Sequence, residues 1–114
     1  MPRTKTPLLT SPPYLVEEAL RRLGFNLRRA RLARNLTLAQ VAGKIGTGTR
    51  AVADAEKGRA GTAVSVYLAL LWAYDQLGPV SQLADPARDA VGLASAARRE
   101  RARGRTVCDL DADF

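Results

Sequence analysis

The chain contains no histidine and a single cysteine, Cys108, among its 114 residues. The absence of histidine excludes the Ser–His and Cys–His arrangements of many hydrolases and removes the commonest transition-metal ligand. One cysteine excludes an internal disulfide, and without histidine it cannot contribute to a zinc cluster. The acidic residues are scattered, and no pair would be directed by one helix into a shared pocket. We therefore expect no enzymatic activity, no metal and no cofactor.

Long apolar runs and aromatic residues are also scarce. No apolar run approaches the ~18 residues that a membrane helix needs; the longest, at 64–72, is bounded by Gly61 and Asp75. Arg3 and Lys5 near the N-terminus have no apolar signal region behind them, so we expect a cytoplasmic protein without a membrane partner. Four aromatic residues are expected to carry much of the packing: Phe25, Tyr67, Trp72 and Tyr74.

Charge of either sign is missing from particular stretches of the chain, although the net charge is +7. Residues 1–35 hold eight Lys or Arg against two acids, and residues 88–105 hold six Arg against two acids. Residues 62–87 contain no base, and residues 106–114 contain three Asp and no base. Basic surfaces are typical of proteins that bind polyanions, but arginine-rich helix faces also occur because they are soluble. Charge alone leaves nucleic acid open as a partner.

The N-terminal third of the chain predicts an arm and one long helical segment. Residues 1–11 are rich in Thr and Pro and are expected to form a disordered arm. Ser11 before two prolines predicts an N-cap for a helix from about Tyr14. Gly24 leaves open whether this helix is divided in two, because a helical glycine costs only ~1 kcal/mol. Asn35 is a plausible left-handed end of the helix.

Capping signals predict the next two helices. Thr37-x-x-Gln40 is a capping box, in which Thr and Gln satisfy free amides at a helix start. It predicts a helix over 38–45 that Gly46 ends. The following helix begins at Thr47 or Gly48, and glycines at 58 and 61 stop it.

Further along, the sequence predicts an apolar helix over 64–77 and a short helix over 80–84. Asp85 before a proline predicts the cap of a last helix over 87–103. We therefore expect a domain over 12–84, a C-terminal helix over 85–104 and an acidic tail over 105–114.

Residues 36–58 read as helix, tight turn and helix, the layout of a helix-turn-helix reader of DNA. The capped start of the first helix offers free amides and a positive dipole end to a phosphate. The small residues of the turn let the backbone approach a duplex closely. Thr49 and Arg50 lead the exposed face of the second helix. Arg binds guanine through its two major-groove acceptors, which contributes ~1–3 kcal/mol of discrimination.

A set of residues at fixed spacing extends this motif in both directions: Leu23, Gly24, Leu27, Arg28, Arg31, Leu36, Thr37, Gln40, Val41, Ala42, Gly46, Val52, Glu56 and Gly58. Over residues 20–78 the set resembles the XRE-type, lambda-repressor-like helix-turn-helix domain. The resemblance implies an all-α, five-helix DNA-binding domain, to which this chain adds a C-terminal helix and flexible tails. It also implies a homodimer on double-stranded DNA with a palindromic operator.

A narrower resemblance lies downstream, in YLALLWAY at 67–74 and LADPARDAVGLA at 83–94. These segments are similar to HipB-like antitoxins, which are encoded beside HipA-type kinase toxins. The resemblance implies an antitoxin that represses its own operon and binds a HipA-like kinase. Two alternatives remain: a stand-alone XRE-family regulator without a toxin, and a protein-interaction adaptor on the same scaffold.

The family resemblance also implies roles for individual residues. The candidate base contacts are Thr49, Arg50 and Asp54. The candidate phosphate contacts are Thr37, Gln40, Lys44, Thr47, Gly48, Lys57 and Arg59. Arg31 and Glu56 occupy positions where many members form a buried ion pair, although they could equally form a solvated pair of little value. An acid at Asp54 can accept from a cytosine amino group but would repel a phosphate.

Overall fold

The computed structural model describes residues 6–103, and these residues form helices and turns without a strand. The chain divides into two compact units, residues 1–78 and residues 79–114. The first unit holds α1 (Pro7–Thr10), α2 (Tyr14–Ala33), α3 (Leu38–Ile45), α4 (Thr49–Glu56) and α5 (Val64–Ala73). The second begins with the 3₁₀ turns η1 (Gly78–Gln82) and η2 (Pro86–Arg88), which precede α6 (Ala90–Arg103).

The expected all-α, lambda-repressor-like fold with a further C-terminal helix is confirmed. The first unit ends at residue 78, whereas the sequence placed the domain boundary at residue 84. The expected acidic tail, at 105–114, and residues 1–5 of the arm lie outside the described residues.

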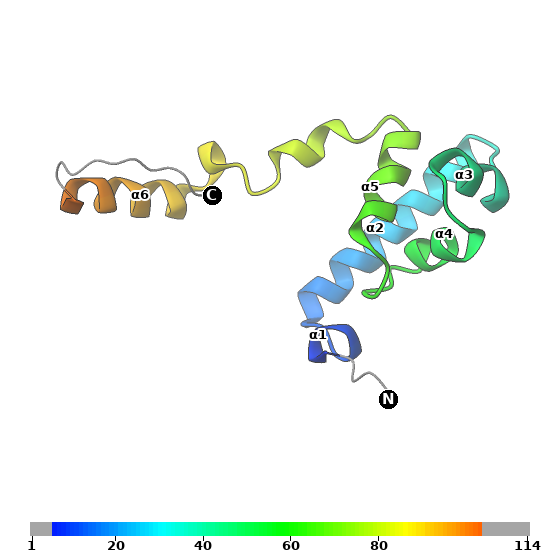
Figure 1. The fold of residues 1–114 in the computed structure, drawn as a ribbon, viewed down its shortest axis with the longest axis horizontal. Coiled ribbons are helices and arrows are strands. Elements are labelled where there is room, and N and C mark those ends of the chain that lie inside the picture. Colours follow the sequence, from blue (N-terminus) through cyan, green and yellow to red (C-terminus); the bar gives the residue numbers. More distant parts are fainter. Residues whose placement is uncertain (1–5, 104–114) are drawn as a thin grey trace. The chain divides into compact units, whose positions relative to one another are not determined.

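The core of the first unit lies among α2, α3, α4 and α5. Helix α4 packs against α2, α3 and α5, and α3 also packs against α5 (Figure 1). The fully buried apolar side chains are Leu27, Val41, Ala42, Val52, Ala55, Tyr67, Leu70 and Tyr74. Because α4 touches all three other helices, its orientation is fixed by the whole bundle.

Two of the four aromatic residues expected in the core are not buried. Tyr67 and Tyr74 are buried, but Trp72 and Phe25 are each 55% exposed. Helix α5 is apolar on all sides, so its sequence does not mark which side faces inward. The buried face carries Tyr67, Leu70 and Tyr74, which follow one another at intervals of three and four residues. Trp72 lies on another side of the helix and stays exposed.

Helix α2 runs without interruption through Gly24, which is buried. A Cβ atom on Gly24 would lie 2.5 Å from the carbonyl oxygen of Ala55 and 2.7 Å from that of Glu56. Gly58 makes the reverse contact, since its Cβ would lie 2.6 Å from the carbonyl oxygen of Leu20. The two glycines therefore let the backbones of α2 and α4 meet directly.

Residues with left-handed backbone conformation end four of the helices. Asn35 (φ 55°), Gly58 (φ 71°) and Asp75 (φ 63°) follow α2, α4 and α5. At each, the amide of this residue and the amide after it donate back to carbonyls of the last turn, as in a Schellman motif. Gly46 (φ 83°) ends α3, and Asn35 ends α2, as the sequence predicts.

The N-terminal arm differs from the expectation in two ways. Residues 7–10 form a helical turn instead of disordered chain, because proline suits the first helical position and the Thr10 hydroxyl donates to carbonyls of the same turn. Ser11 does not cap α2, which begins at Tyr14 with Pro13 in the capping position. A residue before proline is disfavoured in the helical region, so two successive prolines delay the helix start.

The second unit also begins its helix later than expected. The Asp85 side chain accepts from the amide of Ala87 at 2.9 Å, but this caps the turn η2 and not a helix over 87–103. Asp89 has extended backbone, and its carboxylate accepts from the amide of Gly92 at 2.9 Å. This second aspartate therefore stands at the start of α6. The turn η1 replaces the short helix expected before it.

The glycine contact between α2 and α4 can be tested by adding a methyl group. Gly24→Ala should lower the free energy of unfolding by about 1–3 kcal/mol, because the added carbon would overlap two backbone carbonyls. Gly43→Ala is the control: this exposed glycine of α3 has nothing within 4 Å of an added Cβ. It should raise the free energy of unfolding by up to ~1 kcal/mol. Urea denaturation measures both, and unchanged stability of Gly24→Ala would contradict the contact.

Candidate nucleic-acid interface

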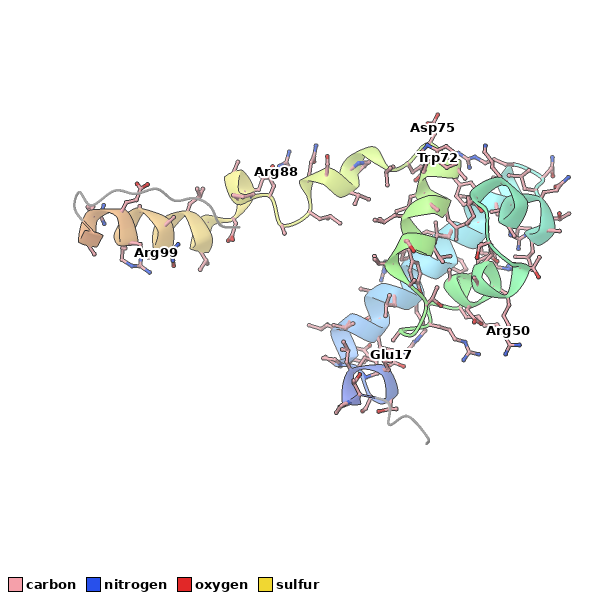
Figure 2. All side chains as sticks on the ribbon, in the orientation of Figure 1. Glu17, Arg50, Trp72, Asp75, Arg88 and Arg99 are labelled. Atoms are coloured by element: carbon pink, nitrogen blue, oxygen red, sulfur yellow. The ribbon has the colours of Figure 1, made fainter. Side chains whose placement is uncertain are left out.

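Helix α4 has a buried face of small side chains and an exposed face. Val52 and Ala55 are fully buried, whereas Thr49, Arg50 and Lys57 are exposed. Arg50 points away from the neighbouring helices into solvent (Figure 2). The two residues that lead the candidate reading face are therefore accessible to a ligand.

The N-terminal ends of α3 and α4 border one shallow hollow of about 720 Å³. Thr37 and Thr49, which stand at these two ends, both line it, together with Asn35 and Ala39. Gly48 is the N-cap of α4 and offers no side chain to the first-turn amides. Free amides and the positive ends of helix dipoles favour anions. The edge of the hollow at Thr37 and Thr49 therefore suits a phosphate group, whereas Leu32, Leu36 and Leu38 make much of the remaining lining apolar.

The capping box leaves donors for such a phosphate. The Thr37 hydroxyl accepts from the amide of Gln40 at 3.1 Å, and the Gln40 side-chain oxygen accepts from the amide of Thr37 at 2.9 Å. A hydroxyl that accepts one hydrogen bond can still donate another, and the Gln40 side chain keeps its NH₂ group. Both candidate phosphate contacts therefore retain hydrogen-bond donors.

A buried ion pair joins α2 to α4. The Arg31 Nε donates to Glu56 Oε2 at 2.7 Å, and its Nη2 donates to Oε1 at 3.1 Å. The two side chains are 10% and 7% exposed. Arg31 Nη1 also donates to the carbonyl of Leu36 at 2.9 Å, which ties in the segment before α3. Hydrogen bonding to Glu56 raises the pKa of Arg31 above its ordinary value, against the opposing effect of burial.

Two of the candidate DNA contacts face each other. Asp54 Oδ1 lies 3.5 Å from Arg59 Nε, and the side chains are 33% and 59% exposed. The family resemblance implied a base contact for Asp54 and a phosphate contact for Arg59, but not a pair between them. The sequence does carry a local signal for this pair, because Gly58 ends α4 in a turn that folds Arg59 back over the last turn of the helix.

The remaining candidate phosphate contacts are spread along the turn and the ends of the two helices. Lys44 Nζ lies over the ring of Trp72, 5.9 Å from its centroid; such stacking contributes ~0.5–1 kcal/mol at exposed sites. Trp72 lies near the C-terminal end of α5 (Figure 2). Thr47 is half-buried in the turn, and Gly48 is exposed. A phosphate would therefore compete only with a weak contact at Lys44.

A basic hollow that the sequence analysis did not single out lies between α2 and the end of α4. Its volume is about 590 Å³, and its lining includes Arg21, Arg22, Phe25, Arg28 and Lys57. The first two arginines form exposed pairs with acids one turn earlier on α2, at 3.3 and 3.9 Å. Such pairs are weak, so these cations remain accessible to an anionic partner.

Arg34 and Tyr74 form a further contact that the sequence did not reveal. Arg34 Nη2 donates to the Tyr74 carbonyl at 2.9 Å, and the guanidinium lies 5.3 Å from the centre of the tyrosine ring. Burial raises the pKa of Tyr74 above its ordinary value. This contact fastens the end of α5 to the end of α2, and its role is structural.

Two other kinds of site are absent from the described residues. No three His, Cys, Asp or Glu side chains within them gather as they would around a metal ion. None of the described helices has the length and apolar character needed to cross a membrane.

An all-α bundle with a short exposed helix after a tight turn defines the class of DNA-binding helix-turn-helix proteins. The family model described as a helix-turn-helix domain matches residues 22–82, which is more than half of the chain. The chain belongs to this family. No curated protein and no solved structure matches the chain.

The buried ion pair predicts a strong asymmetry between single and double substitutions. Glu56→Gln should lower the free energy of unfolding by ~3–5 kcal/mol, because it leaves the Arg31 charge buried without its partner. Replacing both residues together, Arg31→Met with Glu56→Leu, should recover most of this loss.

Urea denaturation measures both variants, with Glu17→Gln as the control. Glu17 pairs with Arg21 in an exposed pair, and its loss should cost no more than ~1 kcal/mol. A Glu56→Gln variant as stable as the control would show that the buried pair has little value.

Proposed function

We propose that the protein is a sequence-specific transcriptional repressor of the XRE type that places α4 in the major groove of DNA. The observation that carries the proposal is the exposed Arg50 on a short helix whose inner face is locked to α2. A rigid scaffold and one outward guanidinium are what readout of guanine requires. Repression then follows from occupancy of the operator, without catalysis.

In this proposal, the residues around α4 divide between base and phosphate contacts. Thr49 and Arg50 face base edges, while Thr37, at the hollow shared by α3 and α4, and Gln40, its partner in the capping box, hold a phosphate. We propose a homodimer on a palindromic operator, because each copy presents only one such reading helix. Several phosphate contacts would make the affinity fall steeply with salt concentration.

We further propose that the protein is the antitoxin of a HipBA-like operon and binds a HipA-like kinase. The support is the resemblance of residues 67–94 together with apolar side chains exposed in the second unit. Leu83, Val91 and Leu93 are 71%, 77% and 51% exposed. Contiguous exposed apolar patches are typical of surfaces that bind another protein, and in this proposal the three side chains belong to one such patch.

Arg50→Ala tests the readout. We expect selection from a random-sequence duplex pool to give a defined site for the wild-type chain. Arg50→Ala should bind that site ~10–100-fold more weakly and lose preference at one base position, which corresponds to ~1–3 kcal/mol. Arg88→Ala, which removes an exposed charge from the second unit, should leave the base preferences unchanged.

Two outcomes of this experiment would contradict the proposal. Unchanged base preference of Arg50→Ala would contradict the assignment of Arg50. If the wild-type chain selected no sequence, the adaptor alternative would be favoured over DNA readout.

The antitoxin proposal is tested with the product of the neighbouring reading frame. Co-expressed with the tagged chain, a kinase encoded there should co-purify with it at a fixed ratio. Val91→Asp should reduce this capture at least tenfold, because it places a charge on the exposed apolar surface, while DNA binding is retained. Failure of the wild-type chain to capture the neighbouring product would favour a stand-alone regulator.

A further inference from the structure

The turn that ends α4 brings an acid and a base together. The Gly58 amide donates to the Ala55 carbonyl at 2.9 Å, and the Arg59 amide donates to the Asp54 carbonyl at 3.1 Å. These two hydrogen bonds form a Schellman motif. In such a motif the residues joined by the longer bond, here Asp54 and Arg59, usually make an apolar contact. Here the side chains at the same positions form an ion pair instead, with 3.5 Å between Asp54 Oδ1 and Arg59 Nε.

The backbone of Arg59 is held from both sides. Its amide is bound to the last turn of α4, and its carbonyl accepts from the Tyr67 hydroxyl of α5 at 2.8 Å. Gly58, the residue before it, has a left-handed φ of 71° and packs directly on the backbone of α2. The start of the Arg59 side chain is therefore fixed relative to α4.

The pair leaves Arg59 with donors to spare. Its contact with Asp54 is made through Nε, so the two terminal NH₂ groups are available for a phosphate, which arginine can bind through two hydrogen bonds. Asp54 has the opposite property. Its carboxylate has no donor to offer, and beside DNA it would repel phosphates unless a cation compensated its charge.

We propose that Asp54 is a positioning residue that aims Arg59 at a DNA phosphate, and that it does not read a base. Arg59 in turn neutralises the carboxylate, so the two side chains act as one unit at the end of the reading helix. This inference rests on the proposed DNA-binding function and revises the role that the family resemblance implied for Asp54. It leaves Thr49 and Arg50 as the base contacts.

A double-mutant cycle on the full chain tests the proposal, with the duplex that the wild-type chain selects from a random pool as the probe. Arg59→Gln should weaken binding about tenfold or more, as expected for a lost hydrogen bond to a charged group. It should also reduce the slope of log affinity against log salt by about 0.9. Adding Asp54→Asn to Arg59→Gln should restore affinity severalfold, because the uncompensated carboxylate is removed.

Asp54→Asn in the otherwise wild-type chain should give no such gain and should leave every base preference unchanged. Arg59→Lys keeps the charge and should retain the wild-type salt slope. The control cycle uses Asp85→Asn and Arg88→Gln, an exposed pair of the second unit whose arginine is 65% exposed, and it should show no coupling in DNA affinity. Circular dichroism of each variant checks that the fold is kept.

The outcomes separate this inference from the proposed function. Two outcomes would overturn the positioning role while DNA readout stands. One is a changed base preference in Asp54→Asn. The other is an effect of Asp54→Asn on affinity that is the same in the wild-type chain and in the Arg59→Gln variant. Selection of no sequence by the wild-type chain overturns the proposed function, and the inference falls with it.

Discussion

The rest of the domain depends on the buried pair between Arg31 and Glu56. The arginine uses three of its nitrogens at once, two on the carboxylate of α4 and one on the carbonyl of Leu36. Removing two charges from water costs several kcal/mol per ion, and the pair recovers this cost only if its geometry is held. Its contribution is therefore orientation: α2, the segment before α3, and α4 must meet at one point for all three bonds to form.

Small residues make that meeting possible. Gly24, Ala55 and Gly58 let the backbones of α2 and α4 come into contact, and a larger residue at any of them would lengthen the distance that the ion pair must span. A side chain as small as that of Ala55 could leave the reading helix loosely packed. The structure gives the opposite result, because the neighbouring glycines move α2 inward and leave Ala55 fully buried.

Local signals in the sequence predicted the helix-turn-helix core well. The bounds of α3 follow from Thr37 and Gly46, whose effects act within one turn of the helix. The continuity of α2 and the exposure of Trp72 could not be read in this way. Each depends on which residues from distant parts of the chain lie opposite, and an all-apolar helix such as α5 carries no periodic mark of its buried face.

The size of the reading surface bears on how the proposed repressor achieves specificity. One arginine at a guanine contributes ~1–3 kcal/mol of discrimination, whereas specific binding typically exceeds non-specific binding by ~4–10 kcal/mol. With Asp54 engaged by Arg59, the outer face of α4 has few other side chains to close that gap. In the proposed complex, a second copy on a symmetric operator would double the base contacts, and the proposed phosphate contacts at both ends of α4 would hold Arg50 in register with its base. The proposed homodimer thus follows from the energetics of a short reading helix as well as from the family resemblance.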